Sequence, residues 1–429
     1  MAFMNVTNAT NVDYTIPEYW SPKLMVDADR ESFWSRWHGE QASNSAIIVK
    51  NELRKNKNGD IVRIQLTDNP KGAGVSSNAT LEGNEEKMSF GQFTVTPTLR
   101  RHAIAFDDQA NALSNVDLAE LARKKMASWT ALKLDDLIFS AVMPVGAAFP
   151  NGTTPSTEIY ANGRTSMATL ALTDYFGINE IDRIKYYLEH QGAKPLMLST
   201  DGKTGQKVPY YACIISEADA FRLQADADWR SAQATALPKG YTNPLFTGAL
   251  GAWNGVLIYK YGSNGSGIGS PMRFEAKLYQ AATAADVTIY IGALVDNGSD
   301  YTKFLPTAGF IHITAGAAGT VETDTYTAKT RNTITCTTAQ NHGADAVVTY
   351  SSTATIATAA RGVSRVLGFG REMAARAWTM KPKPIVNEKD YNFEHGIGTA
   401  FYVGESIVEN TAGINPNSVV MYCSAPSPN

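Results

Sequence analysis

The feature that most constrains this chain is a long β-rich excursion, residues 46–110, with too few apolar side chains to build a core. Its tip between Asn69 and Met88 contains almost no large apolar residue. The Asn58-Gly59 pair between two alternating runs predicts a β-hairpin. A projecting hairpin leaves strand edges open, so we expect another surface to cover them. A solvated hairpin is the open alternative.

Residues 1–45 are a second segment without a core of their own. They carry few aliphatic residues, and Pro17 and Pro22 interrupt any regular element. Tryptophans in such an arm need an apolar surface, because a large indole ring is costly to leave in water. That surface is either the rest of the same chain or a neighbouring subunit.

Composition favours a protein whose outside is covered by other chains, with an ordinary core-rich monomer as the open alternative. Charged residues make up 18% of the 429 residues, below the roughly 25% of ordinary soluble domains, and aromatic residues make up 10%. The net charge of −3 argues against a dedicated DNA-binding protein, which needs a basic excess. Cys213, Cys336 and Cys423 are odd in number and lack metal-ligand spacing, so free thiols are expected.

Helical periodicity alternates with strand patterns along the rest of the chain. Ser114 with Asp117, Thr173 and Ser216 are the expected N-terminal caps of three helices, because their side chains accept hydrogen bonds from free amide groups. The expected helices are 116–143, 174–191, 217–229 and 364–378.

The segment 273–361 differs from its surroundings in composition. Its Thr-rich alternation suits a pleated sheet, so we expect an all-β domain inserted into an α/β body. The preceding stretch, 195–272, alternates strand and helix and predicts a compact α/β unit.

No catalytic or metal-binding motif is found. None of the six histidines is three to five residues from another His or from a Cys, which argues against a metal pair. Adjacent carboxylates, such as Asp135 with Asp136, face different ways on a helix or strand and need not share a proton. We therefore expect no enzyme, no cofactor and no metal, although a triad of residues distant in sequence stays open.

The N-terminal sequence and the chain's hydropathy also limit its class. The first residues lack a charged and then apolar signal sequence, and no 18-residue apolar run occurs, so we expect neither secretion nor membrane insertion. Charges of both signs on the excursion suit docking onto a like subunit. The candidates for contact between subunits are Trp20, Trp34, Trp37, Glu85, Glu86, Arg100 and Arg101.

Several patches, in their order along the chain, resemble one family. These are the LEGNEE run of the excursion with the later Arg100-Arg101, the stretch from FRLQADADW to NPLFTGALGAWNGVLIYKY, and VLGFGREMAARAW followed by EKDYNFEHGIGTAFYVGE. They resemble the N-four-type major capsid family of tailed bacteriophages, whose members have the Hong Kong 97 phage fold. The resemblance covers over half of the chain.

The resemblance implies an α+β, Hong Kong 97-like capsid fold. The segment 273–361 departs from the family's shorter connection, and we expect it to be an inserted all-β domain on the outer face. The implied parts are an N-terminal arm at 1–45, an extended E-loop at 46–110, a spine helix and P-domain at 111–194, an A-domain at 195–272, the insertion at 273–361 and a return to the body at 362–429.

The function implied is structural. Such a protein self-assembles through hexamers and pentamers into the icosahedral head of a tailed phage and encloses double-stranded DNA non-specifically. Expected partners are other copies, a portal and a decoration or scaffolding protein, in the virion and, during assembly, in the host cytoplasm. The alternative is a β-rich adhesin or virion surface-binding protein, and an enzyme ranks third.

Overall fold

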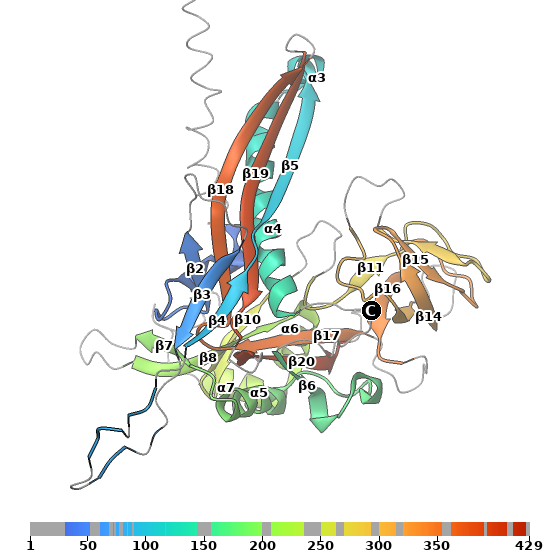
Figure 1. Cartoon of the computed structure of the whole chain (residues 1–429). Helices are drawn as coiled ribbons and strands as arrows, with labels where there is room; N and C mark the ends of the chain where they lie inside the picture. The colour runs from blue at the N-terminus through green and yellow to red at the C-terminus, as the bar shows by residue number, and fades with distance from the viewer. Residues whose placement is uncertain are drawn as a thin grey trace, which may run out of the picture. The chain divides into compact units, whose positions relative to one another are not determined.

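The computed structural model of the chain divides into two compact units (Figure 1). Unit 1 contains Met1–Ala141 and Ala374–Gly413, and unit 2 contains Val142–Met373 and Ile414–Asn429. The residues described are 31–51, 61–67, 72, 74–76, 80–83, 85–87, 90–115, 117–143, 156–199, 207–235, 250–262, 270–292, 300–314, 321–353, 362–389, 393–409 and 415–425.

Unit 1 is built on a five-stranded sheet with the order β1-β2-β18-β19-β5. The short β1 and β2 run parallel to each other, and β2 runs parallel to β18, whereas β18, β19 and β5 form a long antiparallel ribbon. The strands are β1 (His38–Gly39), β2 (Ile47–Asn51), β5 (Thr98–Asp107), β18 (Ala374–Lys389) and β19 (Glu394–Ile407).

The long helix α4 (Leu118–Val142) covers one face of this ribbon, as Figure 1 shows. Leu134 of the helix packs with Trp378 and Phe401 of the sheet. The expected helix is confirmed, but its cap is Asp117, whose carboxylate accepts hydrogen bonds from the first turn. Ser114 instead ends the short helix α3 (Asp108–Leu113), so the prediction that it caps α4 is wrong.

The excursion forms a two-stranded hairpin of β3 (Val62–Thr67) and β4 (Phe90–Val95). The prediction that the strand before Asn58 pairs with the one after it is wrong, because β2 lies between β1 and β18 and has no free edge. Asn58 and Gly59 themselves lie outside the described residues. The expectation that the excursion lacks a core is wrong for the base of the hairpin, because four of its side chains are buried against the sheet. They are Val62, Ile64, Phe93 and Val95.

Unit 2 contains a seven-stranded sheet with the order β6-β20-β17-β8-β10-β9 and with β7 beside β8. Helix α5 (Ile178–His190) packs against β17 and β20. The strands are β6 (Ser156–Tyr160), β7 (Leu196–Ser199), β8 (Lys207–Ile215), β9 (Gly251–Trp253), β10 (Val256–Lys260), β17 (Val363–Phe369) and β20 (Asn415–Ser424).

Ser216 caps helix α6 (Glu217–Ala225) as predicted, in a reciprocal capping box with Asp219. A second helix, α7 (Ala227–Thr235), follows directly. The expected helix at 364–378 is wrong, because the chain forms β17 and the start of β18 there. All seven residues of β17 are buried, and a strand buried on both faces shows a continuous apolar run that periodicity cannot tell from a helix.

The segment expected to be all-β contains a six-stranded sheet in the order β11-β16-β13-β14-β15-β12. Ile311, Ile313 and Tyr326 lie fully buried on one face of it. Its strands are β11 (Glu275–Lys277), β12 (Thr288–Tyr290), β13 (Gly309–Ile313), β14 (Glu322–Lys329), β15 (Thr333–Cys336) and β16 (Val347–Ser351).

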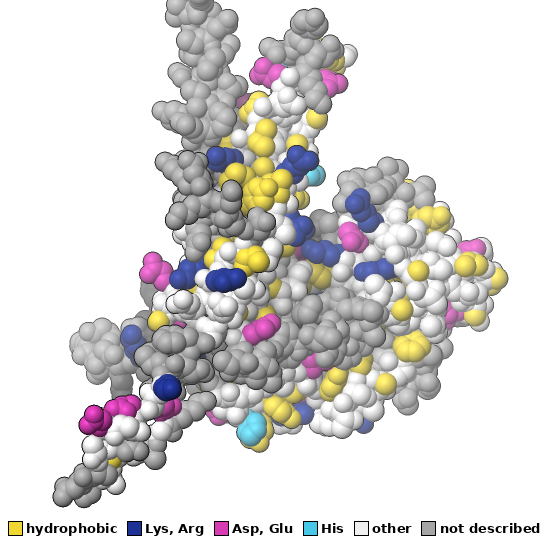
Figure 2. All heavy atoms as spheres, in the orientation of Figure 1, with side chains coloured by type: hydrophobic (Ala, Val, Ile, Leu, Met, Phe, Trp, Pro, Cys, Tyr) yellow, Lys and Arg dark blue, Asp and Glu magenta, His cyan; other side chains and the backbone are white. Residues whose placement is uncertain are grey.

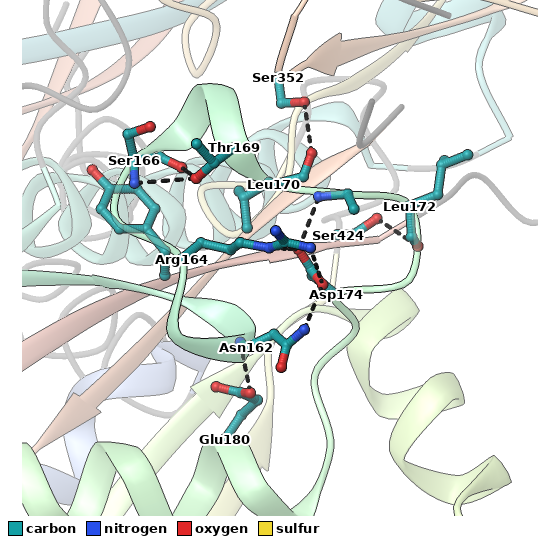
Figure 3. A network of polar contacts seen from close by, with 12 residues as sticks. Asn162, Arg164, Ser166, Thr169, Leu170, Leu172, Asp174, Glu180, Ser352 and Ser424 are labelled. Carbon is teal, nitrogen blue, oxygen red and sulfur yellow. Dashed lines mark hydrogen bonds and ion pairs between the residues drawn. The ribbon is translucent and has the colours of Figure 1, made fainter. Parts of the chain in front are cut away.

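A polar network holds the segment before α5 in place, as Figure 3 shows. The buried carboxylate of Asp174 accepts hydrogen bonds from Arg164 Nε at 2.8 Å, Asn162 Nδ2 at 3.2 Å and the Ala171 amide at 2.8 Å. Because these contacts turn the chain at Asp174, α5 begins only at Ile178, with Gly177 as its cap. The prediction that Thr173 is the cap is therefore wrong.

Two carboxylates share the buried face of the six-stranded sheet. Glu322 and Asp324 alternate on β14, and Glu322 Oε1 lies 2.8 Å from Nε2 of the buried His342. Burial, together with hydrogen bonding and repulsion from Glu322, raises the pKa of Asp324 to about 7. Asp324 is therefore protonated in the folded protein at a pH where it is ionised in the unfolded chain.

This raised pKa predicts that unit 2 loses stability as the pH rises from about 4 to about 7. The unfolded chain releases the Asp324 proton first, whereas the folded protein keeps it, and the loss is complete above about 7. Asp324→Asn is expected to remove this loss and to stabilise the protein by about 2 kcal/mol near pH 8, with little effect near pH 4. Calorimetric unfolding at both pH values measures this, and an equal effect at both would contradict it.

Candidate assembly interface

The face of the unit 1 ribbon opposite α4 carries a groove of about 550 Å³. Strand register identifies this face. The ring of His102 stacks on Trp129 of α4, with the ring centroids 4.8 Å apart, so His102 points to the α4 side. Its neighbour Ala103 therefore points to the opposite side, together with its partner Gly398 and the next such pair, Ala105 and Gly396. The two glycines place bare backbone at the centre of the groove. A side chain on Gly398 would crowd the His102 carbonyl oxygen, but one on Gly396 would meet only ordinary contacts.

Apolar and basic side chains border the groove. Leu99, Ile385 and Tyr402 are 43%, 48% and 39% exposed, which is high for large apolar side chains on a folded surface. Arg101 and Lys383 flank Ala400 in one cross-strand row, and both are exposed. Figure 2 shows hydrophobic side chains gathered over this part of β5, β18 and β19, with basic groups beside them. The groove is also lined by the exposed Glu394, so it is the end beside Arg101 and Lys383 that suits an acidic segment carrying an apolar side chain.

The described residues of the hairpin tip have this complementary chemistry. Leu81 is 63% exposed, and Glu82, Glu85 and Glu86 are exposed beside it. Glu86 accepts a hydrogen bond from the Gly72 amide at 2.5 Å, which joins the two sides of the tip.

The N-terminal candidates pack inside their own chain. Trp34 and Trp37 are 0% and 5% exposed, and the ring of Trp34 lies 5.1 Å from that of Phe139 on α4. These two tryptophans thus pack on the rest of their own chain and not on a neighbouring subunit. Neither ring is available to a neighbour in the described conformation. Trp20 lies outside the described residues.

Arg100 and Arg101, although adjacent, point to opposite faces of β5. Arg100 pairs with Phe401 on the α4 side and is half-buried near Glu405, whereas Arg101 is exposed on the groove side. Of the residues considered for contact between subunits, Glu85, Glu86 and Arg101 are thus exposed and Arg100 is not.

Comparisons with known proteins agree on one class. The family described as "Phage capsid protein" matches residues 3–383. The chain belongs to this phage capsid protein family. The major capsid protein of Pseudomonas phage KPP25 is 25% identical over 289 residues, 60% of this chain and 74% of that protein.

Solved capsids show the same fold at lower identity. The capsid of Ralstonia phage GP4 has a TM-score of 0.60 at 18% identity, covering 93% of this chain and 92% of that chain. The capsid of cyanophage Pam1 has a TM-score of 0.57 at 15% identity, covering 93% of each chain. The protein is a phage major capsid protein with a Hong Kong 97-like α+β fold, which assembles with itself into the shell of the virion. The adhesin alternative finds no support.

Metal ligands and thiols remain to be located in the part of the capsid protein that is described. No group of three His, Cys, Asp or Glu side chains there could hold a metal ion. Cys213, Cys336 and Cys423 are buried free thiols, as expected. Within the same residues no helix is long and apolar enough to cross a membrane.

Sequence reasoning missed the residues of β18 and β19 that form the groove. The signal was present as a Lys-Pro-Lys-Pro-Ile run, 381–385, in which Lys381, Lys383 and Ile385 are exposed while the prolines are buried. Gly396 and Gly398 alternate on the neighbouring strand. Each pattern is local, but only strand pairing places both beside Arg101.

Proposed function

We propose that copies of this capsid protein interlock by placing the tip of one hairpin in the groove of the next copy. The observation that supports this is the match of an exposed leucine and three exposed carboxylates with an apolar groove bordered by Arg101 and Lys383. Charge pairs of this kind set register and orientation more than affinity, and burial of Leu81 supplies apolar contact.

Repetition of one such contact around symmetry axes generates a closed shell of hexamers and pentamers. We further propose that the shell joins a portal, binds decoration or scaffolding proteins, and encloses double-stranded DNA through weak contacts. The net charge of −3 is consistent with weak, non-specific binding of the genome. The segment 273–361 is proposed as an inserted domain on the outer face.

We also propose the domain boundaries that the resemblance to the capsid family implies. It places the arm at 1–45, the E-loop at 46–110, the spine helix and P-domain at 111–194, the A-domain at 195–272 and the return at 362–429.

Filling the groove tests the interface without removing a charge. Gly396→Val adds a strand-compatible side chain whose Cβ makes only ordinary contacts in the single chain. It is expected to raise the protein concentration needed for shell formation at least about tenfold, because a filled groove excludes the tip. Negative-stain microscopy and sedimentation over a concentration series measure this. Gly396→Ala is the control with a smaller effect, and normal assembly of the valine variant would contradict the proposal.

A further inference from the structure

Strand β5 forms one edge of the unit 1 sheet, on the outer side of the long ribbon in Figure 1. Its ten residues pair with β19 on the inner side without a shift of register. Within the described residues, no strand or backbone group hydrogen-bonds to β5 from its outer side. Natural proteins protect such an edge with a short strand, a bulge or a proline, and β5 has none of these. The edge is therefore able to accept another strand.

The charges along β5 are separated by sign. Arg100 and Arg101 lie near its start, whereas Asp107 ends it and Asp108 follows directly. The two arginines lie as far before Ile104 as the two aspartates lie after it. The edge is thus complementary in charge to a second copy of itself, turned to run in the opposite direction.

These charged groups keep donors and acceptors for a partner. Neither Arg100 nor Arg101 makes a hydrogen bond or a salt bridge to another described residue, and Nε of Arg100 is buried without a partner there. Asp107 Oδ1 caps α3, and Asp108 Oδ1 lies 2.8 Å from His395 Nε2. Each carboxylate therefore retains its other oxygen for a further donor.

We propose that β5 pairs with β5 of a second copy of the capsid protein, antiparallel and about a two-fold axis through Ile104. An axis perpendicular to the sheet leaves each face on its own side, so residues of the same face lie opposite each other. Arg101 then lies opposite Asp107 of the partner subunit, and Arg100 lies opposite Asp108 of the partner subunit. Symmetry repeats both pairs.

Charge selects this register among those that a two-fold axis allows. An axis through Ala103 would set Arg101 opposite Ala105 of the partner subunit, and an axis through Ala105 would set it opposite Gln109 of the partner subunit. Only the register centred on Ile104 sets both arginines opposite acids. A guanidinium group has five donors, so Arg101 can also meet the hairpin tip of another copy. The strand pairing is thus a second contact between copies, separate from the tip and groove.

Disulfide trapping in assembled shells tests the register. Ala103 and Ala105 are exposed, and the proposed pairing sets each opposite the other across the axis. Chains with Ala103→Cys and chains with Ala105→Cys are mixed before assembly and treated with a mild oxidant afterwards. The mixture is expected to crosslink at least about tenfold faster than either variant alone, because opposite Cβ atoms are within disulfide reach and diagonal ones are not. The three native cysteines are buried.

The two single-variant shells are the controls for this experiment. Faster crosslinking in shells of Ala103→Cys alone, or of Ala105→Cys alone, would show another register and overturn the proposal. Assembled mixed shells without crosslinks would overturn it as well.

A charge variant keeps the proposal testable if the cysteine variants fail to assemble. Asp107→Asn keeps an acceptor for the cap of α3 but removes the charge opposite Arg101. It is expected to raise the protein concentration needed for shell formation about threefold, and high salt should reduce this difference. Asp117→Asn, at the cap of α4 and off β5, is the matched control and should follow the parent.

This variant also separates the strand pairing from the contact between tip and groove, because Asp107 does not line the groove. Assembly of Asp107→Asn at the same concentration as the parent at low salt would overturn the strand pairing and leave the groove contact standing.

Discussion

Reversing two tip charges, Glu85→Lys with Glu86→Lys, is expected to abolish shell formation, and adding Arg101→Glu with Lys383→Glu to the same chain is expected to restore it. Like charges facing each other across an interface cost several kcal/mol, and the shell repeats that cost at every tip. The fourfold variant carries the opposite charges on both partners and recovers attraction. Sedimentation and negative-stain microscopy at low and high salt distinguish the variants, because salt screens exposed charges.

Two controls separate charge from folding in this experiment. Glu85→Gln with Glu86→Gln removes the charges but keeps an acceptor for the Gly83 and Gly72 amides, so an intermediate effect is expected. Glu189→Lys reverses an exposed carboxylate on α5 and should assemble normally. If the fourfold variant assembles no better than the double variant, the tip does not meet the groove.

Removing the buried cation of unit 1 has the largest expected effect on stability. Arg376→Ala leaves Glu405 buried with its main counter-charge gone, which costs about 3 to 5 kcal/mol of the free energy of unfolding. Replacing both partners by apolar side chains, as in Arg376→Met with Glu405→Leu, is expected to cost less than the single change, because no charge is left buried. Denaturant unfolding of the unassembled subunit near pH 8 measures both.

An exposed ion pair of the same unit provides the comparison. Lys124 and Glu120 on α4 are 61% and 56% exposed, so Lys124→Ala is expected to change the free energy of unfolding by less than about 0.5 kcal/mol. A loss below about 1 kcal/mol in Arg376→Ala would show that the buried pair contributes no more than an exposed one.

Sequence patterns that act within a few residues predict part of the fold correctly. Ser216 caps α6 as predicted because the cap and the amides that it satisfies are within one turn of each other. The apolar spacing over 116–143 correctly predicts the long helix α4, although Ser114 is not its cap. The same reasoning failed at 364–378, because burial on both faces of β17 hides the period of a strand.

Some properties of this capsid protein follow from sequence alone. A hairpin tip with almost no apolar residues cannot form a core, and low charge with many aromatics favours a covered surface, wherever the chain folds. The tertiary structure alone decided which face each side chain occupies. The position of Trp34 on its own α4 and the burial of Asp135 near Arg376 depend on packing between segments far apart in sequence. The placing of Arg101 and Lys383 on either side of Ala400 depends on pairing between distant strands. A shift of one residue in that pairing would reverse every face, and no local pattern specifies it.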